Sequence, residues 1–218
     1  MAGPKQVDKA TKGLNALVDE FTSAVKELVN AGEETAVHLA VGGGRAISAI
    51  IDATGEVTKV TVETAENRMD DVETYVRGDT LVIDMSSSGR RNYWRNVDVD
   101  VVIAIKSLEG IEVMGAVEAD IKGVDSERLE IEIKGAADLN IEGKCGELDL
   151  DVRGAGDISA SDLKCESVEV DVAGAGNASV YATDKVDADV AGVASIQVYG
   201  KPKTVRKHVG GLGSISIR

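Results

Sequence analysis

A regular alternation of apolar and polar residues runs through the second half of the chain, and it returns in the same phase at each of six glycines. The glycines are spaced 20, 19, 20, 18 and 19 residues apart. Around the four central ones, the positions six, four and two residues before and four and six residues after are all aliphatic. Such alternation turns one face of a strand inward, so each repeat predicts two β-strands joined at a glycine corner. The six are Gly115, Gly135, Gly154, Gly174, Gly192 and Gly211.

The constant phase predicts that these repeats stack on one another. A meander of hairpins would also alternate, but it would not return the same residue types every 18 to 20 residues. Residues 97–218 are therefore predicted to form a parallel β-solenoid of coils of about 19 residues. A polar residue three places after each glycine, such as Asn177, is expected to hydrogen-bond the turn backbone. Glu109 and Lys207 replace apolar residues in the outer coils, as expected where a stack ends.

The first part of the chain has a different pattern. Residues 1–32 carry apolar residues at alternating spacings of three and four, which predicts an amphipathic α-helix. This helix either covers the open end of the solenoid or pairs chains into a homo-oligomer, and we favour the cap because about three heptads form a marginal coiled coil. Residues 33–96 predict a lead-in of strands at 36–41, 46–53 and 57–64, a hairpin at 72–85, and a loop.

The charge of the chain limits its partners. The formal net charge is -14, which disfavours nucleic acid and anionic membrane surfaces, since both attract cationic patches. No apolar run is long enough to span a bilayer. The first residues lack the layout of a signal peptide. We therefore expect the cell envelope or secretion if an export signal lies upstream, and the cytoplasm otherwise.

The two cysteines occupy equivalent places in neighbouring coils. Cys145 and Cys165 each stand three residues before the first inward residue of the next strand, so they are expected to stack at the same corner. A buried thiol pair and a disulfide both fit this placement. Two thiolates alone do not predict a metal site.

Carboxylates occupy the outward positions of the strand before each central glycine. Stacking would align them in two columns on one sheet, where neighbours would stand about 5 Å apart and repel one another. A solvated face that keeps sheets from associating explains them, and a surface for divalent cations is the alternative, with Asp149, Asp151, Glu169 and Asp171 as its ligands. The columns comprise Glu130 and Glu132, Asp149 and Asp151, Glu169 and Asp171, and Asp187 and Asp189.

The strand after each glycine presents a nearly neutral face. Its outward positions include Asn140, Ser159, Ser179, Gln197 and Ser216, and beside them Tyr181 and Tyr199. A glycan would suit this surface, although an ordinary β-surface would look the same. The loop at 86–96 gathers the only tryptophan with arginines, a composition typical of binding hot spots. Its candidate contact residues, for a glycan or a surface protein, are Arg90, Arg91, Tyr93, Trp94 and Arg95.

Several of these segments resemble a known family. They are Gly-Ala-Gly-Asp at 154–157, Gly-Ala-Gly-Asn at 174–177, Asp-Thr-Leu-Val-Ile at 79–83, and Val-Tyr-Gly-Lys-Pro at 198–202 before Gly-Leu-Gly-Ser at 211–214. Together they are similar to the head domain of autotransporter adhesins, the GIN domain (DUF2807 type), over roughly residues 40–218. The resemblance implies a right-handed β-helix in a bacterial envelope protein with an adhesive role.

The sequence predicts neither a catalytic residue nor a cofactor. His38 and His208 lie far apart and match no metal-ligand spacing, and no phosphate-binding or nucleophile motif is present. We therefore expect an all-β, non-enzymatic binding or adhesion module of the cell envelope. The alternative is a cytoplasmic scaffold that assembles by stacking or helix pairing.

Overall fold

The protein is an all-β molecule in the computed structural model, which describes residues 35–41, 48–63, 72–77, 80–84 and 99–218. The all-β prediction is confirmed. The predicted helix at 1–32 and the loop at 86–96 lie outside the described residues. None of those described forms a helix long and apolar enough to cross a membrane. The strands are β1 (Thr35–Val41), β2 (Ser48–Glu63), β3 (Glu73–Arg77), β4 (Thr80–Asp84), β5 (Val99–Tyr199), β6 (Thr204–Val209) and β7 (Ser214–Ile217).

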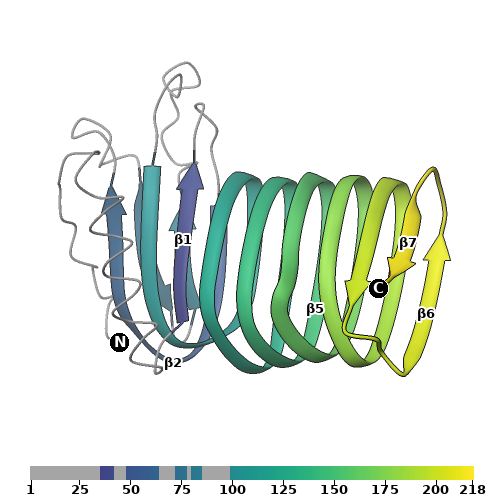
Figure 1. Ribbon diagram of the computed structural model, residues 1–218. Coiled ribbons are helices and arrows are strands. Elements are labelled where there is room, and N and C mark those ends of the chain that lie inside the picture. The colour runs from purple at the N-terminus through teal and green to yellow at the C-terminus, as the bar shows by residue number, and fades with distance from the viewer. Residues whose placement is uncertain (1–34, 42–47, 64–71, 78–79, 85–98) are drawn as a thin grey trace, which may run out of the picture.

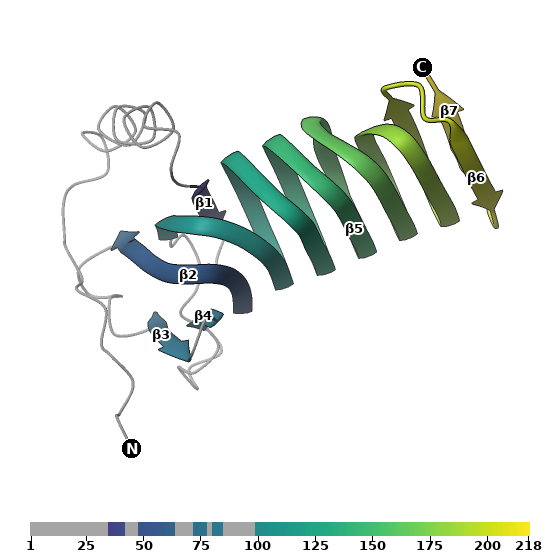
Figure 2. The same ribbon diagram turned by 90° about the horizontal axis from the view of Figure 1, so that it is seen from below.

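The long element β5 winds through successive coils that follow one another along a single axis (Figure 1). Seen at right angles, β1 to β4 lie at one end of this stack, and β6 and β7 lie at the other (Figure 2). Each coil returns the chain to the same place after 18 to 20 residues, as the spacing of the glycines shows. Residues that are distant in sequence are therefore neighbours in space.

The repeated glycines form one column along the corner of the coils, as the repeat predicts. A Cβ atom built on Gly154 would lie 1.8 Å from the carbonyl oxygen of Gly135, and one built on Gly174 would lie 1.8 Å from that of Gly154. Gly154 also has a φ of 151°. Only glycine combines this backbone conformation with so close an approach of the next coil.

The interior of the coils is aliphatic because alternate residues point inward. Val168, Val170 and Val172 are at most 5% exposed, whereas Glu169 and Asp171 between them are exposed. Equivalent aliphatic residues of the other coils are buried in the same cluster. At about 1.5–3 kcal/mol for each fully buried aliphatic side chain, this interior is the main stabilising term of the fold.

The N-terminal end of the stack is built from antiparallel pairs. β1 pairs with two successive runs of β5, so that Val37 lies opposite both Ile103 and Ile121. The strands predicted at 46–53 and 57–64 are one strand, β2, which lies between β5 and β4. β4 pairs in turn with β3, as the predicted hairpin requires. The outer strand of this end is β3, so the sheet order is β1-β5-β2-β4-β3.

Glu109, which stands at a position that is apolar in the inner coils, faces outward. The pairing of β2 with β5 shifts here, so that Asp52 lies opposite Gly110 and Ala53 opposite Leu108. Glu109 is skipped by this irregularity and is exposed, while Leu108 is fully buried. A β-bulge therefore turns the charged side chain outward and keeps the interior aliphatic.

The C-terminal end continues the coils with two short parallel strands. β6 pairs with β5 from Lys185↔Thr204 to Val190↔Val209, and β7 pairs with β5 from Ser195↔Ser214 to Val198↔Ile217. Lys207 lies opposite the buried Ala188 and is itself exposed, as expected for a terminal repeat. The two strands have no further neighbour on their outer side among the described residues.

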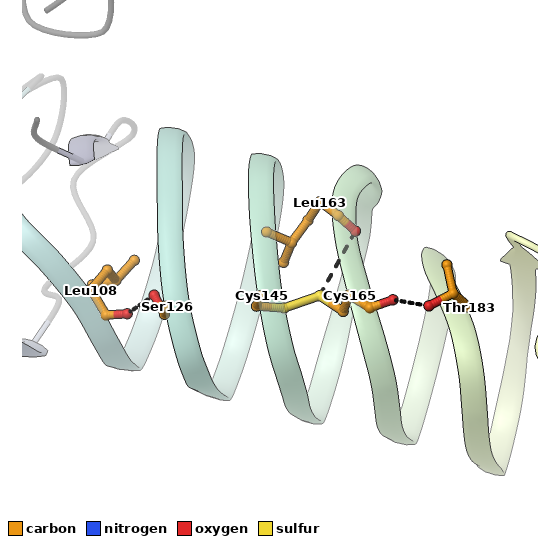
Figure 3. The surroundings of a disulfide bond; sticks show 6 residues. All are labelled: Leu108, Ser126, Cys145, Leu163, Cys165 and Thr183. Atoms are coloured by element: carbon orange, nitrogen blue, oxygen red, sulfur yellow. Dashed lines mark hydrogen bonds between the residues drawn. A yellow bond between two sulfur atoms is a disulfide. The ribbon is translucent and has the colours of Figure 1, made fainter. Parts of the chain in front are cut away.

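The two cysteines form a disulfide at a corner of the coils (Figure 3). The Cα atoms of Cys145 and Cys165 are 4.5 Å apart, and both residues are buried. Of the two states that the sequence allowed, the structure therefore has the disulfide. Side-chain hydroxyls join the neighbouring coils at the same corner, since Ser126 donates to the Leu108 carbonyl and Thr183 donates to that of Cys165 at 3.4 Å.

Candidate functional site

The strand before each glycine presents one broad surface, here called the acidic face. It carries the two predicted carboxylate columns on the outward positions of β5, and the aliphatic residues between them are buried. The predicted alternation of this strand is confirmed. Its eight carboxylates are Glu130, Glu132, Asp149, Asp151, Glu169, Asp171, Asp187 and Asp189.

Basic side chains neutralise the first part of the acidic face. The Lys134 ammonium lies 2.9 Å from carboxylate oxygens of both Glu112 and Glu132. The Arg153 guanidinium bridges neighbouring coils by pairing with Glu132 at 3.3 Å and with Asp151. Sequence reasoning missed both, although each stands directly before a repeat glycine. A column of like charges is thus broken wherever a coil ends in Lys-Gly or Arg-Gly.

The middle of the acidic face keeps its negative charge. No ion pair joins Glu169, Asp171 or Asp189 to a basic side chain among the described residues. Partial burial raises the pKa of Asp171 above its ordinary value of 3.8, and the nearby charges of Asp189, Glu169, Asp151 and Asp149 raise this pKa further. Four nearby carboxylates therefore act on Asp171 at once.

The four predicted cation ligands lie on this face, but two of them already have basic partners. Arg128 is 3.5 Å from Asp149, and Arg153 pairs with Asp151. Within the part of the chain that the structure describes, no three His, Cys, Asp or Glu side chains group closely enough to hold a metal ion. Cation binding by Asp149, Asp151, Glu169 and Asp171 stays a prediction.

The strand after each glycine presents the second surface, here called the polar face. On this face the Asn140 amide donates to Asp120 at 3.1 Å, and in the turn before the strand the Asn177 amide donates to Asp157 at 2.7 Å. The expected bond from Asn177 to its own turn is thus replaced by one to the preceding coil. The reason is that stacked coils place equivalent polar residues within reach of each other. The polar face consists of Asn140, Ser159, Tyr181, Ser179, Gln197, Tyr199 and Ser216.

The two tyrosines of the polar face are half-buried and held in place. The Lys164 ammonium lies 4.0 Å from the centre of the Tyr181 ring and donates to the Ser161 carbonyl. The Tyr199 hydroxyl donates to the side-chain carbonyl of Gln197 at 3.1 Å. Sequence reasoning missed Lys164, whose only signal was its place before Cys165. The cation fixes the Tyr181 ring, so the polar face offers preordered aromatic and hydroxyl groups.

The remaining predicted binding residues cannot be placed beside these surfaces. Arg90, Arg91, Tyr93, Trp94 and Arg95 lie outside the described residues. The structure therefore brings together Tyr181 and Tyr199 on one face and the four carboxylates on the other. Their arrangement places these side chains on two extended faces of the coils.

Comparisons with known proteins point to adhesins. The sequence model of a family described as "Putative auto-transporter adhesin, head GIN domain" (DUF2807) matches residues 44–202. The crystal structure of a putative adhesin from Bacteroides fragilis is similar, with a TM-score of 0.52 and 25% sequence identity. The similarity covers 70% of this chain and 79% of that chain. A comparison with curated proteins gives no match.

Proposed function

The chain belongs to the GIN-domain family of auto-transporter adhesin heads, and from this premise we propose that it is a non-catalytic adhesion module of the bacterial cell envelope. The observation that carries the proposal is the match of the family over residues 44–202, which includes most of the coils. The coils suit the role because they present long, regular surfaces on a rigid aliphatic interior.

The proposal includes the architecture of the coils, a right-handed parallel β-helix. Its support is the parallel pairing of β6 and β7 with β5 and the contact of each repeat glycine with the glycine one coil earlier. Coils joined in this way satisfy the backbone of each turn through its neighbours. A crystal structure in which the coils turn with the opposite hand would overturn this part of the proposal.

We propose the polar face as the adhesive surface and a neutral glycan as its class of ligand. Sugars bind flat arrays of hydroxyl and amide groups through hydrogen bonds and place their apolar faces on aromatic rings. Tyr181 and Tyr199 supply the rings, and Gln197 and Ser179 supply the polar groups. The acidic face is a less suitable surface for anionic glycans, because its carboxylates would repel them.

Glycan binding is tested by presenting the purified full chain to an array of neutral oligosaccharides. We expect binding that the double change Tyr181→Ala and Tyr199→Ala reduces at least tenfold. Tyr75→Ala in β3 is the matched control, since Tyr75 is also a half-buried tyrosine, but it lies away from the polar face and under Arg77. Binding that is absent, or equally lost in both variants, would overturn the polar face as the glycan surface.

The disulfide supports a location outside the cytoplasm. Disulfides persist in oxidising compartments and are reduced in the cytosol. Cys145 and Cys165 are joined, so the protein is proposed to work in the envelope rather than as a cytoplasmic scaffold. The test is to produce the protein from its full-length gene, alkylate free thiols in intact cells and fractionate the cells. Alkylated cysteines in the cytosolic fraction would favour the scaffold instead.

A further inference from the structure

The last coil has a positive charge, opposite in sign to that of the whole chain. Residues 200–218 contain five lysine and arginine residues and no aspartate or glutamate, in a chain with a formal net charge of -14. In register, Arg206 lies beside Asp187 and His208 beside Asp189. Each acidic column is therefore followed by a basic residue in the final coil that the structure describes.

The preceding coil satisfies only part of this basic charge. The Lys203 ammonium is 2.8 Å from Asp184, and the Arg206 guanidinium is 3.8 Å from Asp187. No ion pair is formed by Lys201, Lys207 or Arg218 among the described residues. Lys201, Lys207 and Arg218 therefore leave positive charge at this end of the stack that no described carboxylate neutralises.

The same end exposes backbone groups that can pair. The Gly210 amide donates to the Val190 carbonyl at 2.7 Å, on the β5 side of the strand. Backbone groups of a parallel strand point to its two sides in alternation, so those of Val205, Lys207 and Val209 point away from β5. Among the residues that the structure describes, strand β6 is therefore an edge whose backbone groups at these three positions face no further strand.

Apolar side chains border this edge. Val205, Val209 and Ile217 are 38–40% exposed, and Leu212 at the corner is 86% exposed. In earlier coils the residues of the same inward columns are buried, as Val186 and Val190 are. A strand laid on β6 would cover Val205 and Val209 as each coil covers the one before it.

Lys207 decides which strand can bind. It stands in the inward column between Val205 and Val209, so an apolar strand would bury an unpaired ammonium, which is costly. A second copy of the same edge would place Arg206 and Lys207 against their equivalents and be repelled. A strand with carboxylates opposite Arg206 and Lys207 compensates both positive charges. The edge therefore attracts acidic strands, and it disfavours apolar strands and copies of itself.

We propose that the β6 edge is a docking site for one extended, acidic segment of a partner protein, in which acidic residues lie between two apolar residues four positions apart. The segment would add to the stack by backbone hydrogen bonds to Val205, Lys207 and Val209. Its carboxylates would lie beside Arg206 and Lys207, and its apolar residues would lie over the two valines. The inference is independent of glycan binding, which concerns the polar face.

The probe is a fluorescent peptide with the sequence of residues 166–173 in which glutamate replaces Val170, Glu-Ser-Val-Glu-Glu-Asp-Val-Ala. Its two valines match Val205 and Val209, and the acidic residues between them match Arg206, Lys207 and His208. Binding to the full chain is followed by fluorescence anisotropy. Two control peptides separate charge from strand pairing. One replaces the four acidic residues with lysine, and the other is methylated on the backbone nitrogens of its residues 169 and 171, which keeps every charge and removes the donors that would face β6.

Two protein variants test the edge itself. Lys207→Pro removes an amide that points away from β5, so it leaves the pairing with β5 intact and blocks only the open side. Lys207→Ala is its matched control for the backbone. The double change Arg206→Glu and Lys207→Glu reverses the charge, and Lys144→Glu is its control because Lys144 is an exposed lysine of an inner coil, paired with Asp125. Melting curves verify that each variant folds.

We expect the acidic peptide to bind the wild-type chain, and each control peptide to bind at least tenfold more weakly. Lys207→Pro and the charge-reversed variant should lose at least tenfold in affinity for the peptide, whereas Lys144→Glu should bind as the wild type does. Equal binding of the methylated peptide, or of polyglutamate, would overturn the proposal in favour of a general polyanion surface. Binding of anionic vesicles but not of the peptide, or a concentration-dependent dimer that Lys207→Pro abolishes, would overturn it as well.

Discussion

Cys145 and Cys165 are separated by 20 residues in sequence, yet their Cα atoms lie 4.5 Å apart in a disulfide that joins neighbouring coils. This distance is close to the spacing of neighbouring strands in a sheet, about 4.8 Å. The bond therefore crosses the stack at one corner and does not distort its spacing. It encloses one complete coil, so it fixes the repeat covalently.

We expect loss of this disulfide to destabilise the fold. A closed loop of this length stabilises a protein by about 3 kcal/mol in the chain-entropy description. The double change Cys145→Ala and Cys165→Ala should lower the free energy of unfolding by up to about that amount, measured by denaturant titration. A reducing agent should have a similar effect on the wild type and none on the double variant. An equal effect on both proteins would contradict the bond.

The glycine column predicts that replacing Gly154 with alanine destabilises the fold much more than replacing Gly210 does. Gly154→Ala places a methyl group against the Gly135 carbonyl oxygen and forces alanine into a φ of 151°, so we expect a loss of at least about 2 kcal/mol of stability. Gly210→Ala is the matched control, because the nearest atom to its added Cβ is 3.7 Å away. Thermal melting compares the two. A Gly154 variant as stable as the Gly210 variant would refute the close approach.

The interior and the glycine column could be predicted from sequence because both follow from a short period. Residues such as Val170 and Gly174 recur in fixed phase, and stacking like on like is the packing that buries them all. The N-terminal end could not be predicted, because the single strand β2 owes its length to antiparallel pairing with β5. The bulge that exposes Glu109 arises from the same pairing.

The candidate surfaces were predictable only in part. The alternation showed which side chains face outward, so Asp171 and Tyr181 were found. Their basic neighbours were not found. Arg153 and Lys164 contact residues of neighbouring coils, and the alternation along one strand does not show which side chains meet across coils. Whether Cys145 and Cys165 form a disulfide also could not be predicted, because it depends on the distance between their coils.

Val170→Asp tests the inward assignment. Val170 is fully buried between neighbouring coils, so an aspartate there would be an unpaired buried charge. We expect a loss of about 4 kcal/mol or more, and cooperative unfolding at a lower temperature. Glu169→Gln on the exposed side of the same strand should change stability by about 0.5 kcal/mol or less. Calorimetry distinguishes the two, and similar melting temperatures would contradict the assignment.

Asp171 should make stability depend on pH. Its pKa is raised in the folded chain by burial and by the nearby carboxylates, so the folded state binds its proton more tightly than the unfolded state does. Stability should therefore fall as the pH rises from the ordinary value of 3.8 to the raised one. Asp171→Asn should melt at a slightly higher temperature than the wild type at pH 7, and this difference should disappear below pH 3.8. A gain that is constant with pH would exclude titration as its cause.

The acidic face also makes a prediction for calcium. If Asp149, Asp151, Glu169 and Asp171 bind the ion, millimolar calcium should raise the melting temperature, because a ligand that binds only the folded state shifts the equilibrium toward it. The change Asp151→Asn with Asp171→Asn should then remove the response. Sodium chloride at equal ionic strength is the control, since screening alone also relieves repulsion among the carboxylates.

We expect calcium to stabilise the protein no more than sodium chloride does. The reason is that Arg128 and Arg153 already hold Asp149 and Asp151, so an ion at these positions would have to displace a guanidinium from each carboxylate. Arg153→Gln tests this explanation, because it frees Asp151 and leaves Glu132 paired with Lys134 alone. A calcium-specific rise that appears only in this variant would show that the arginine occupies a site that a cation could fill. A rise in the wild type at matched ionic strength would show instead that the acidic face binds calcium as it stands.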